Sequence, residues 1–141
     1  MVRRSHIPLY RVRLKIAAVL NILEMISVAA SITSPELLEK GKPSRHVPFK
    51  NLLFALTVRC AGLLEGITFY SPAIKRNSSL GEAELSELED TISAKRKEIA
   101  EAQRLLEKGM LAPALSRLAK SKLGLAELAE KLDAKIESRI K

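Results

Sequence analysis

The stretch that decides the fold is residues 82–106, which read EAELSELEDTISAKRKEIAEAQRLL. Its apolar residues recur at steps of three and four, the spacing of one face of an α-helix. Ser79 and Glu82 have the spacing of a capping box, so the pattern predicts a long helix over about residues 80–108. The positions expected to be buried are Leu85, Leu88, Ile92, Ile99, Ala102 and Leu106, with Lys95 as the polar interruption.

A second helix with the same periodicity is predicted over residues 111–139, after breaks at Gly109 and Pro113. Because the connection is short, the two helices should run antiparallel. Residues 77–111 carry a net charge of −3 and residues 112–141 carry +3, which favours the pairing. The expected core positions of the second helix are Leu111, Leu115, Leu118, Leu125, Ala129, Leu132 and Ile136.

The outer positions of this predicted coiled-coil hairpin leave two interpretations open. Its apolar stripe can be satisfied within the domain, or Leu105, Leu128 and Ile140 can also serve a partner helix. We expect both.

Two further long helices are predicted upstream, over about residues 8–33 and 49–69. The first has only a narrow polar stripe and is expected to be largely buried. In the second, Ala55, Gly62 and Gly66 form a stripe of small residues around Arg59 that favours close approach of another helix. The expected core positions are Val12, Ile16, Val19, Leu20, Leu23, Ile26 and Ala30 in the first helix, and Phe49, Leu52, Leu53, Leu56, Cys60, Leu63 and Ile67 in the second.

The connections are predicted from turn and cap signals. Ser34-Pro35 begins a short helix that Gly41 ends, and residues 42–48 are interrupted by two prolines and predict a basic linker. Ser71-Pro72 is expected to end the second long helix. The fold class is therefore all-α, a helical bundle with a basic helical region over 1–76 and an antiparallel coiled-coil hairpin over 77–141, in one cooperative domain of 141 residues.

Neither apolar run predicts a membrane span, because Asn21 and Glu24 interrupt the first, and Arg59 and Glu65 the second. Cys60 is the single cysteine, so an intrachain disulfide is impossible and a cytoplasmic location is expected. Few amides, no tryptophan and many charged residues favour a heat-adapted source.

The sequence contains no recognisable set of catalytic residues. The two histidines and one cysteine have no metal-ligand spacing, and no glycine-rich phosphate loop precedes a helix. We therefore expect no enzyme activity, no metal and no cofactor. Glu24 and Glu65 stand in apolar helices, and a buried acid can be a tuned catalytic group. A structural ion pair with Arg13 or Arg59 is the favoured interpretation.

The net charge of +8 lies entirely in residues 1–76, which hold 12 Lys or Arg against four acids. If the first two long helices are antiparallel, these cations form groups at two ends roughly 30 Å apart. Such an array suits an extended polyanion, and nucleic acid is favoured over an acidic protein or lipid headgroups. With few aromatic residues, backbone contact without sequence specificity is expected. The candidate nucleic-acid-binding residues are Arg3, Arg4, Arg11, Arg13, Lys15, Lys42, Arg45, Lys50, Arg59, Lys75 and Arg76.

The stretch Val58-Arg59-Cys60-Ala61-Gly62-Leu63, followed by Ile67 and Phe69, resembles the Arg-x-x-Gly-Leu segment of the small all-helical subunits of CRISPR effector complexes, the Cmr type especially. The resemblance covers about a dozen of the 141 residues. It implies a non-enzymatic subunit, part of antiviral defence, that lines the channel holding guide RNA and target. Arg59 is the basic residue that matches the motif.

Other classes of protein fit the same charge pattern. Helical coat proteins of filamentous archaeal viruses also place a basic N-terminal helix on DNA and join subunits by helix packing, which would make the location a virion. A protein-scaffold or ribosome-associated subunit is a further alternative. In each case we expect other protein subunits as partners. Neutralising Arg3, Arg4, Arg11 and Arg13 is expected to weaken binding more than neutralising Lys120, Lys122, Lys131 and Lys135.

Overall fold

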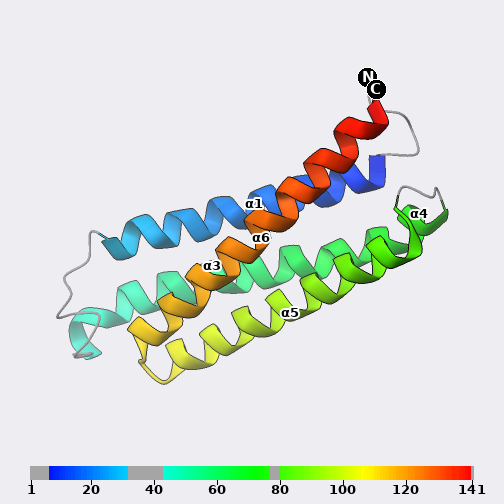
Figure 1. Ribbon diagram of the computed structural model, residues 1–141. Helices are drawn as coiled ribbons and strands as arrows, with labels where there is room; N and C mark the ends of the chain where they lie inside the picture. The colour runs from blue at the N-terminus through cyan, green and yellow to red at the C-terminus, as the bar shows by residue number, and fades with distance from the viewer. Residues whose placement is uncertain (1–6, 32–42, 77–79, 141) are drawn as a thin grey trace.

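The structure is a computed structural model that describes residues 7–31, 43–76 and 80–140, and their side chains except those of residues 43–49 and 138–140. Four long helices pack as a bundle (Figure 1). They are α1 (Ile7–Ser31), α3 (Pro43–Ile67), α5 (Glu82–Glu107) and α6 (Leu111–Ile140). No strand occurs among the described residues, and the all-α prediction is confirmed for that part of the chain.

Successive long helices run in opposite directions along the bundle (Figure 1). Each helix packs against two others: α1 against α3 and α6, and α5 against α3 and α6. The diagonal pairs, α1 with α5 and α3 with α6, have few contacts or none among the described residues. The antiparallel arrangement expected for the first two long helices and for the last two is therefore observed.

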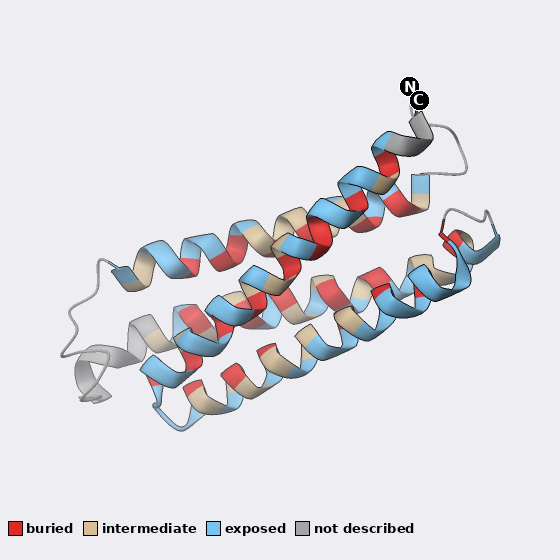
Figure 2. Cartoon of the chain, in the orientation of Figure 1, coloured by how far each residue is buried: buried red, intermediate tan, exposed pale blue. Residues whose placement is uncertain are grey.

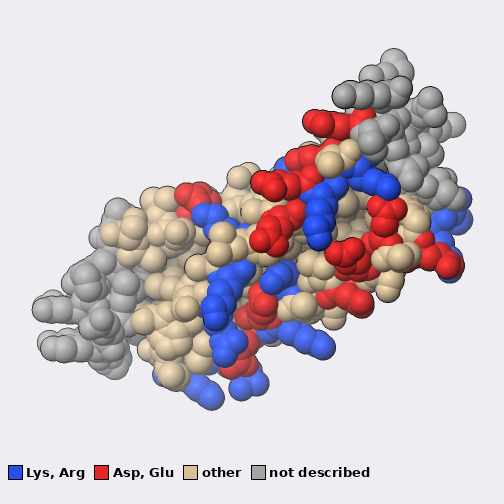
Figure 3. All heavy atoms as spheres, viewed as in Figure 1, with Lys and Arg blue, Asp and Glu red and all other residues tan. Residues whose placement is uncertain are grey.

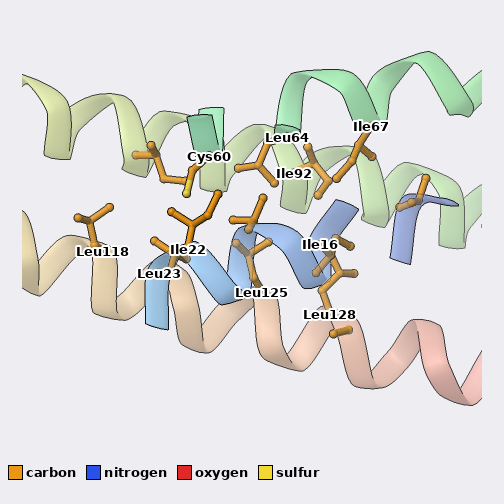
Figure 4. Packing of buried hydrophobic residues seen from close by; sticks show 14 of the residues in the cluster. Ile16, Ile22, Leu23, Cys60, Leu64, Ile67, Ile92, Leu118, Leu125 and Leu128 are labelled. Carbon is orange, nitrogen blue, oxygen red and sulfur yellow. The ribbon is translucent and has the colours of Figure 1, made fainter. Parts of the chain in front are cut away.

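The core runs along the middle of the bundle, and all four long helices contribute to it (Figure 4). Ile16, Leu64, Ile92 and Leu125 represent the four helices there. The prediction for α5 is confirmed at every position, since its buried residues are the six that the sequence indicates. In α6 the predicted core positions are also buried, except that Leu115 is half-buried.

Helix α5 begins later than expected. Its N-cap is Gly81, whose backbone N–H donates to Glu84 Oε1 at 3.1 Å, and Leu85 N–H donates to the Gly81 carbonyl at 2.9 Å. The predicted pairing of Ser79 with Glu82 is therefore wrong, and Ser79 itself lies outside the described residues. Of the two hydrogen bonds of a capping box, the one that the glutamate side chain accepts is present, two residues later in the chain than predicted.

The connection between α5 and α6 is a Schellman turn. Gly109 has a φ of 77°, a left-handed conformation that glycine adopts without steric cost. Met110 N–H donates to the Leu105 carbonyl at 2.8 Å, and Gly109 N–H donates to the Leu106 carbonyl at 3.0 Å. The predicted break at Gly109 is confirmed, and Pro113 fits within the first turn of α6, where its missing N–H costs nothing.

The predicted linker over residues 42–48 is wrong from Pro43 onward, because α3 already begins there. Pro43 is the first residue of the helix, where proline is tolerated. Pro48 removes one hydrogen bond without ending the helix. Lys42 and the short helix predicted at 35–40 lie outside the described residues.

Ser71-Pro72 does not end the helical path either. After α3 ends at Ile67, a 3₁₀ turn η2 (Thr68–Tyr70) leads directly into the short helix α4 (Ser71–Arg76). Pro72 is in the first turn of α4, a position that needs no donor. Ile74 of α4 is fully buried, so this segment closes one end of the core.

The outer surface of α1 and α3 contradicts the prediction that α1 is largely buried. Leu14, Met25 and Val28 are each about half exposed, at 51%, 53% and 52% (Figure 2 shows exposed residues on both helices). Leu52, predicted as core, is exposed as well, and the side chain of Phe49 is not described. Each helix has only two neighbouring helices in a four-helix bundle. A helix with apolar residues on nearly every side therefore carries more of them than the core can cover.

The stripe of small residues on α3 likewise meets no helix. A Cβ at Gly62 would touch nothing within 4 Å, and Ala55 is exposed. Gly66 instead receives the side chain of Lys15, whose Nζ would lie 3.4 Å from an added Cβ. The expected close approach of a helix is therefore not observed among the described residues.

Candidate interaction surfaces

The contact between α5 and α6 is fixed by charge at one end. Lys131 Nζ lies 3.2 Å from Glu87 Oε1, and Lys135 Nζ lies 2.8 Å from Glu84 Oε2. The residue number rises on α6 as it falls on α5, as antiparallel packing requires. The predicted charge complementarity of the two helices is borne out in this half of the hairpin.

A partly buried polar cluster lies midway along the same contact. The buried Ser121 hydroxyl donates to Glu98 Oε2 at 2.7 Å, and Lys95 Nζ donates to both carboxylate oxygens at 3.2 Å. Burial by itself raises the pKa of Glu98, but the Ser121 and Lys95 hydrogen bonds and the charges of Lys95 and Arg117 outweigh it and lower that pKa. Lys95, the predicted polar interruption, therefore has a partner at the helix contact.

Helices α1 and α6 are joined by two ion pairs. Arg13 makes a two-pronged contact with Asp133, through Nε to Oδ1 at 2.8 Å and Nη2 to Oδ2 at 3.1 Å. Glu24 pairs with Lys122. The expected partner of Glu24 or Glu65 was Arg13 or Arg59, and that pairing is wrong: both acids lie on the outside of their helices, and Arg13 turns to α6.

The predicted nucleic-acid-binding residues fall into four groups. Arg13 and Lys15 are engaged inside the protein, since Lys15 Nζ lies over the ring of Tyr70, 6.0 Å from its centroid. Arg11 and Arg59 are exposed on the outer side of α1 and α3. Half-buried Lys50 and exposed Lys75 and Arg76 lie toward opposite ends of the bundle. The rest lie outside the described residues or, for Arg45, have no described side chain: Arg3, Arg4, Lys42 and Arg45.

A second basic surface lies over the half of the hairpin nearer the connection between α5 and α6, with a few acids among its cations (Figure 3). Residues 95–122 carry eight Lys or Arg against three acids, whereas residues 80–94 carry five acids and no Lys or Arg. Charges summed over whole helices conceal this polarity, although sums over half-helices would have detected it. The members whose side chains form no ion pair or hydrogen bond with a described residue are Arg96, Lys97, Lys108, Arg117 and Lys120, and we name them the hairpin basic surface.

This finding changes the expectation for the C-terminal lysines. Lys131 and Lys135 face acids of α5, as expected, but Lys120 is exposed and pairs with no described acid. Lys122 pairs with Glu24 of α1 and with no acid of α5. The C-terminal lysines are therefore not equivalent.

Two hollows on the surface show the same polarity. One, of about 760 Å³, lies near the start of α5 and is lined by acids such as Glu84, Glu89 and Asp90, with Lys75 at its edge. The other, of about 350 Å³, lies between α3 and α5 and includes Arg96 and Lys97. A phosphate group is repelled by the first hollow and attracted by the second.

The positions proposed for a partner helix on the hairpin are mostly unavailable. Leu128 is buried and Leu105 is partly buried against the core, while the side chain of Ile140 is not described. The exposed large apolar residues of the hairpin are Met110 and Leu123. The predicted outer face for a partner helix is therefore wrong at Leu128, because α6 rotates that residue into the bundle.

The outer side of α1 and α3 is the more apolar surface. The segments Ile7–Ser31 and Lys50–Arg76 are both long and apolar enough to cross a membrane by length and composition, and only 28% of each apolar window is buried. We name the exposed apolar residues on this side the α1/α3 face: Ile7, Tyr10, Leu14, Met25, Val28, Leu52, Val58 and Phe69.

The described part of the chain offers little for covalent or metal chemistry. Cys60 is fully buried, as predicted, and burial raises the pKa of its thiol to about 12. Within residues 7–31, 43–76 and 80–140 no three His, Cys, Asp or Glu side chains gather as a metal site. Comparison with known proteins finds no matching protein family, no matching curated protein and no matching solved structure.

Proposed function

We propose that the protein is a non-enzymatic helical subunit of a nucleoprotein assembly, and that it binds the phosphate backbone of RNA or DNA without sequence specificity. The observation that carries the proposal is the hairpin basic surface. Its five cations form no ion pair with a described acid, so their charge is available to an external anion. Nonspecific nucleic-acid binding needs accessible cations rather than a catalytic arrangement.

The placement of the cations supports contact with an extended backbone. Arg96 and Lys97 lie beside the groove between α3 and α5, and Lys108 follows at the connection to α6. Lys50, near the start of α3, and Lys75 with Arg76, at the end of α4, are additional candidates toward the two ends of the bundle. A phosphate chain follows such a path without base readout, since phosphate contacts carry no sequence information directly.

The assembly type is proposed from the resemblance around Arg59, a small subunit of a CRISPR effector complex located in the cytoplasm. Arg59 is exposed on α3, which leaves it accessible to a nucleic acid. We further propose that α5 and α6 pair as an antiparallel coiled coil. The support is the heptad spacing of buried residues together with the Glu84–Lys135 and Glu87–Lys131 pairs at its edge.

Salt-dependent binding tests the proposal. Fluorescence anisotropy with labelled single-stranded RNA and duplex DNA, over a series of KCl concentrations, compares wild type with Lys97→Gln, Arg117→Gln and Lys120→Gln combined. We expect weaker binding across unrelated sequences. The slope of log affinity against log salt should fall by about 0.7 per lost contact on single strands and about 0.9 on duplex. A strong preference for duplex DNA would favour the filament-coat alternative.

The matched control neutralises Lys131 and Lys135, which already face Glu87 and Glu84. These variants should change affinity and slope little. A separate variant, Arg11→Gln with Arg59→Gln, measures what the outer side of α1 and α3 contributes. The proposal is overturned if wild-type affinity does not change with salt concentration, or if the control variant lowers affinity as much as the test variant does.

A further inference from the structure

The apolar residues of the α1/α3 face have no role in the proposed nucleic-acid contact. Eight of the ten exposed large apolar residues of the described chain belong to this face, and the other two belong to the hairpin. A helix that is apolar on nearly all sides is normally covered, by a protein core or by lipid. In the bundle, α1 and α3 are covered on their inner sides only (Figure 2).

The exposed residues of α1 continue along its whole length. Ile7, Tyr10, Leu14, Met25 and Val28 are separated by steps of three, four, eleven and three residues, and Ala18 and Asn21 divide the step of eleven into four, three and four. Such steps place them on one side of the helix. Leu52 and Val58 on α3 and Phe69 on η2 give a broader outer surface, with the open position of Gly62 between Val58 and Phe69.

Cations accompany these apolar residues. Apart from Arg13 and Lys15, which are engaged inside the protein, the described side chains of α1, α3, η2 and α4 include five Lys or Arg and two acids, and one of those acids, Glu24, is paired with Lys122. Arg11 and Arg59 lie on the outer side among the apolar residues, and half-buried Lys50 and exposed Lys75 and Arg76 lie toward its two ends. The occupant of this side therefore has to be anionic at its surface and apolar beneath it.

From this combination we infer that the α1/α3 face lies on an anionic lipid surface. Phosphate headgroups meet the Arg and Lys side chains, and the acyl boundary receives Leu14, Met25 and their neighbours, as in interfacial amphipathic helices. A nucleic acid offers phosphates but no apolar phase for these residues. A second copy offers the apolar phase, but it brings the same excess of positive charge to the contact.

The bundle lies on the bilayer and does not cross it. Helices α5 and α6 carry charges along their outer sides, including Lys97, Arg104 and Glu127, and moving these into the hydrocarbon would be costly. With the α1/α3 face on the lipid, the outer sides of α5 and α6 remain in water. The hairpin basic surface therefore stays available to a second anion at the same time.

Flotation of the full-length protein with vesicles tests this inference. We use phosphatidylcholine vesicles with and without phosphatidylglycerol, and expect the protein to float with the anionic vesicles and much less with the neutral ones. Leu14→Ser with Met25→Ser should lower the partition coefficient about tenfold or more, because two half-exposed apolar side chains are lost from the contact. Arg11→Gln with Arg59→Gln should lower it about fivefold per cation.

The matched control is Met110→Ser with Leu123→Ser, which removes two exposed apolar residues from the hairpin and should leave flotation unchanged. Circular dichroism melting checks that every variant folds, and RNA anisotropy should not respond to Leu14→Ser with Met25→Ser. The inference is overturned if the control lowers flotation as much as the test variant, or if wild type ignores anionic vesicles. It is also overturned if sedimentation shows a stable dimer that the Leu14 and Met25 substitutions dissociate without any vesicle binding, since the occupant is then a second copy.

Discussion

The α1/α3 side and the α5/α6 side share one core but differ in the residues that face outward. On α5 and α6 nearly every outer position is charged, polar or alanine, and ion pairs such as Lys131 with Glu87 connect the two helices. On α1 and on α3 with η2, the outer positions include Leu14, Met25 and Phe69, the last 80% exposed. The exterior of α5 and α6 is polar enough to face water, whereas α1 and α3 present apolar surface that a partner would cover.

The two sides also differ in the number and sign of their charged residues. On α5 and α6, acids and bases are both numerous and partly paired, and the excess of bases appears only over residues 95–122. On α1 and α3 the described charges are fewer, five Lys or Arg against two acids. Two anionic partners of different chemistry therefore suit the two sides better than one.

The largest expected effect tests whether the outward-facing apolar residues of both helix pairs lie outside the core. Ile16→Ala on α1 and Leu125→Ala on α6 each remove a fully buried side chain, one from each helix pair, and each should cost about 2–5 kcal/mol of unfolding free energy. Their matched partners, Leu14→Ala and Leu123→Ala, should cost under about 0.5 kcal/mol. Urea unfolding followed by circular dichroism measures all four. If Leu14→Ala were as damaging as Ile16→Ala, the apolar side would be part of the core and the comparison would fail.

A smaller effect is expected at the polar cluster between α5 and α6. Ser121→Ala removes the hydroxyl that donates to Glu98 at 2.7 Å, and should lower stability by about 1 kcal/mol. Thr57→Val on α3 is the comparison, since that buried hydroxyl bonds only to the Phe54 carbonyl of its own helix at 2.8 Å and joins no second helix. Equal loss in both variants would mean that the cluster adds nothing specific to the α5–α6 contact.

The same cluster has a pH dependence whose sign is fixed. Because the folded-state pKa of Glu98 lies below its unfolded value of about 4.3, ionised Glu98 stabilises the folded protein above that pH. This contribution should be lost as pH falls through the lower, folded-state pKa. The melting temperature of wild type should therefore exceed that of Glu98→Gln near neutral pH, and the difference should shrink on acidification. A difference that grows in acid would contradict the assignment.

The smallest effect concerns two helical glycines, one on each side. Gly62→Ala meets nothing within 4 Å on α3 and should stabilise the protein by about 0.5–1 kcal/mol through helix propensity. Gly124→Ala on α6 would collide with the Lys95 side chain, which would have to leave Glu98, so the gain should be offset. Thermal melting of both variants checks this. A loss of stability in Gly62→Ala would indicate that α3 is covered there after all.

Local pattern was sufficient for the helices and for much of the core. Periodicity located all four long helices, and it identified every buried position of α5, because an amphipathic helix has only one way to turn its apolar side inward. Signals that depend on a single residue were less reliable. Pro43 and Pro72 indicated breaks, yet each stands in the first turn of a helix, where proline is tolerated.

The surfaces could be predicted only in part. The positive charge of the N-terminal half was evident from the sequence, but which cations remain accessible was not, since Arg13 finds Asp133 and Lys15 finds Tyr70 across 120 and 55 positions of chain. The hairpin basic surface was missed because charges were summed over whole helices. All the predicted binding residues stay a prediction, and those outside the described part of the chain also have no described position.

By itself, the sequence determined that the chain forms long helices, that the last two pair antiparallel, and that positive charge exceeds negative. These properties follow from short-range rules of spacing, capping and composition. Only the tertiary structure decided that the side of α1 with Leu14 and Met25 is left exposed. Helix α1 is apolar around much of its circumference, which predicted that it is largely buried, but α3 and α6 cover only the side that carries Ile16 and Leu23.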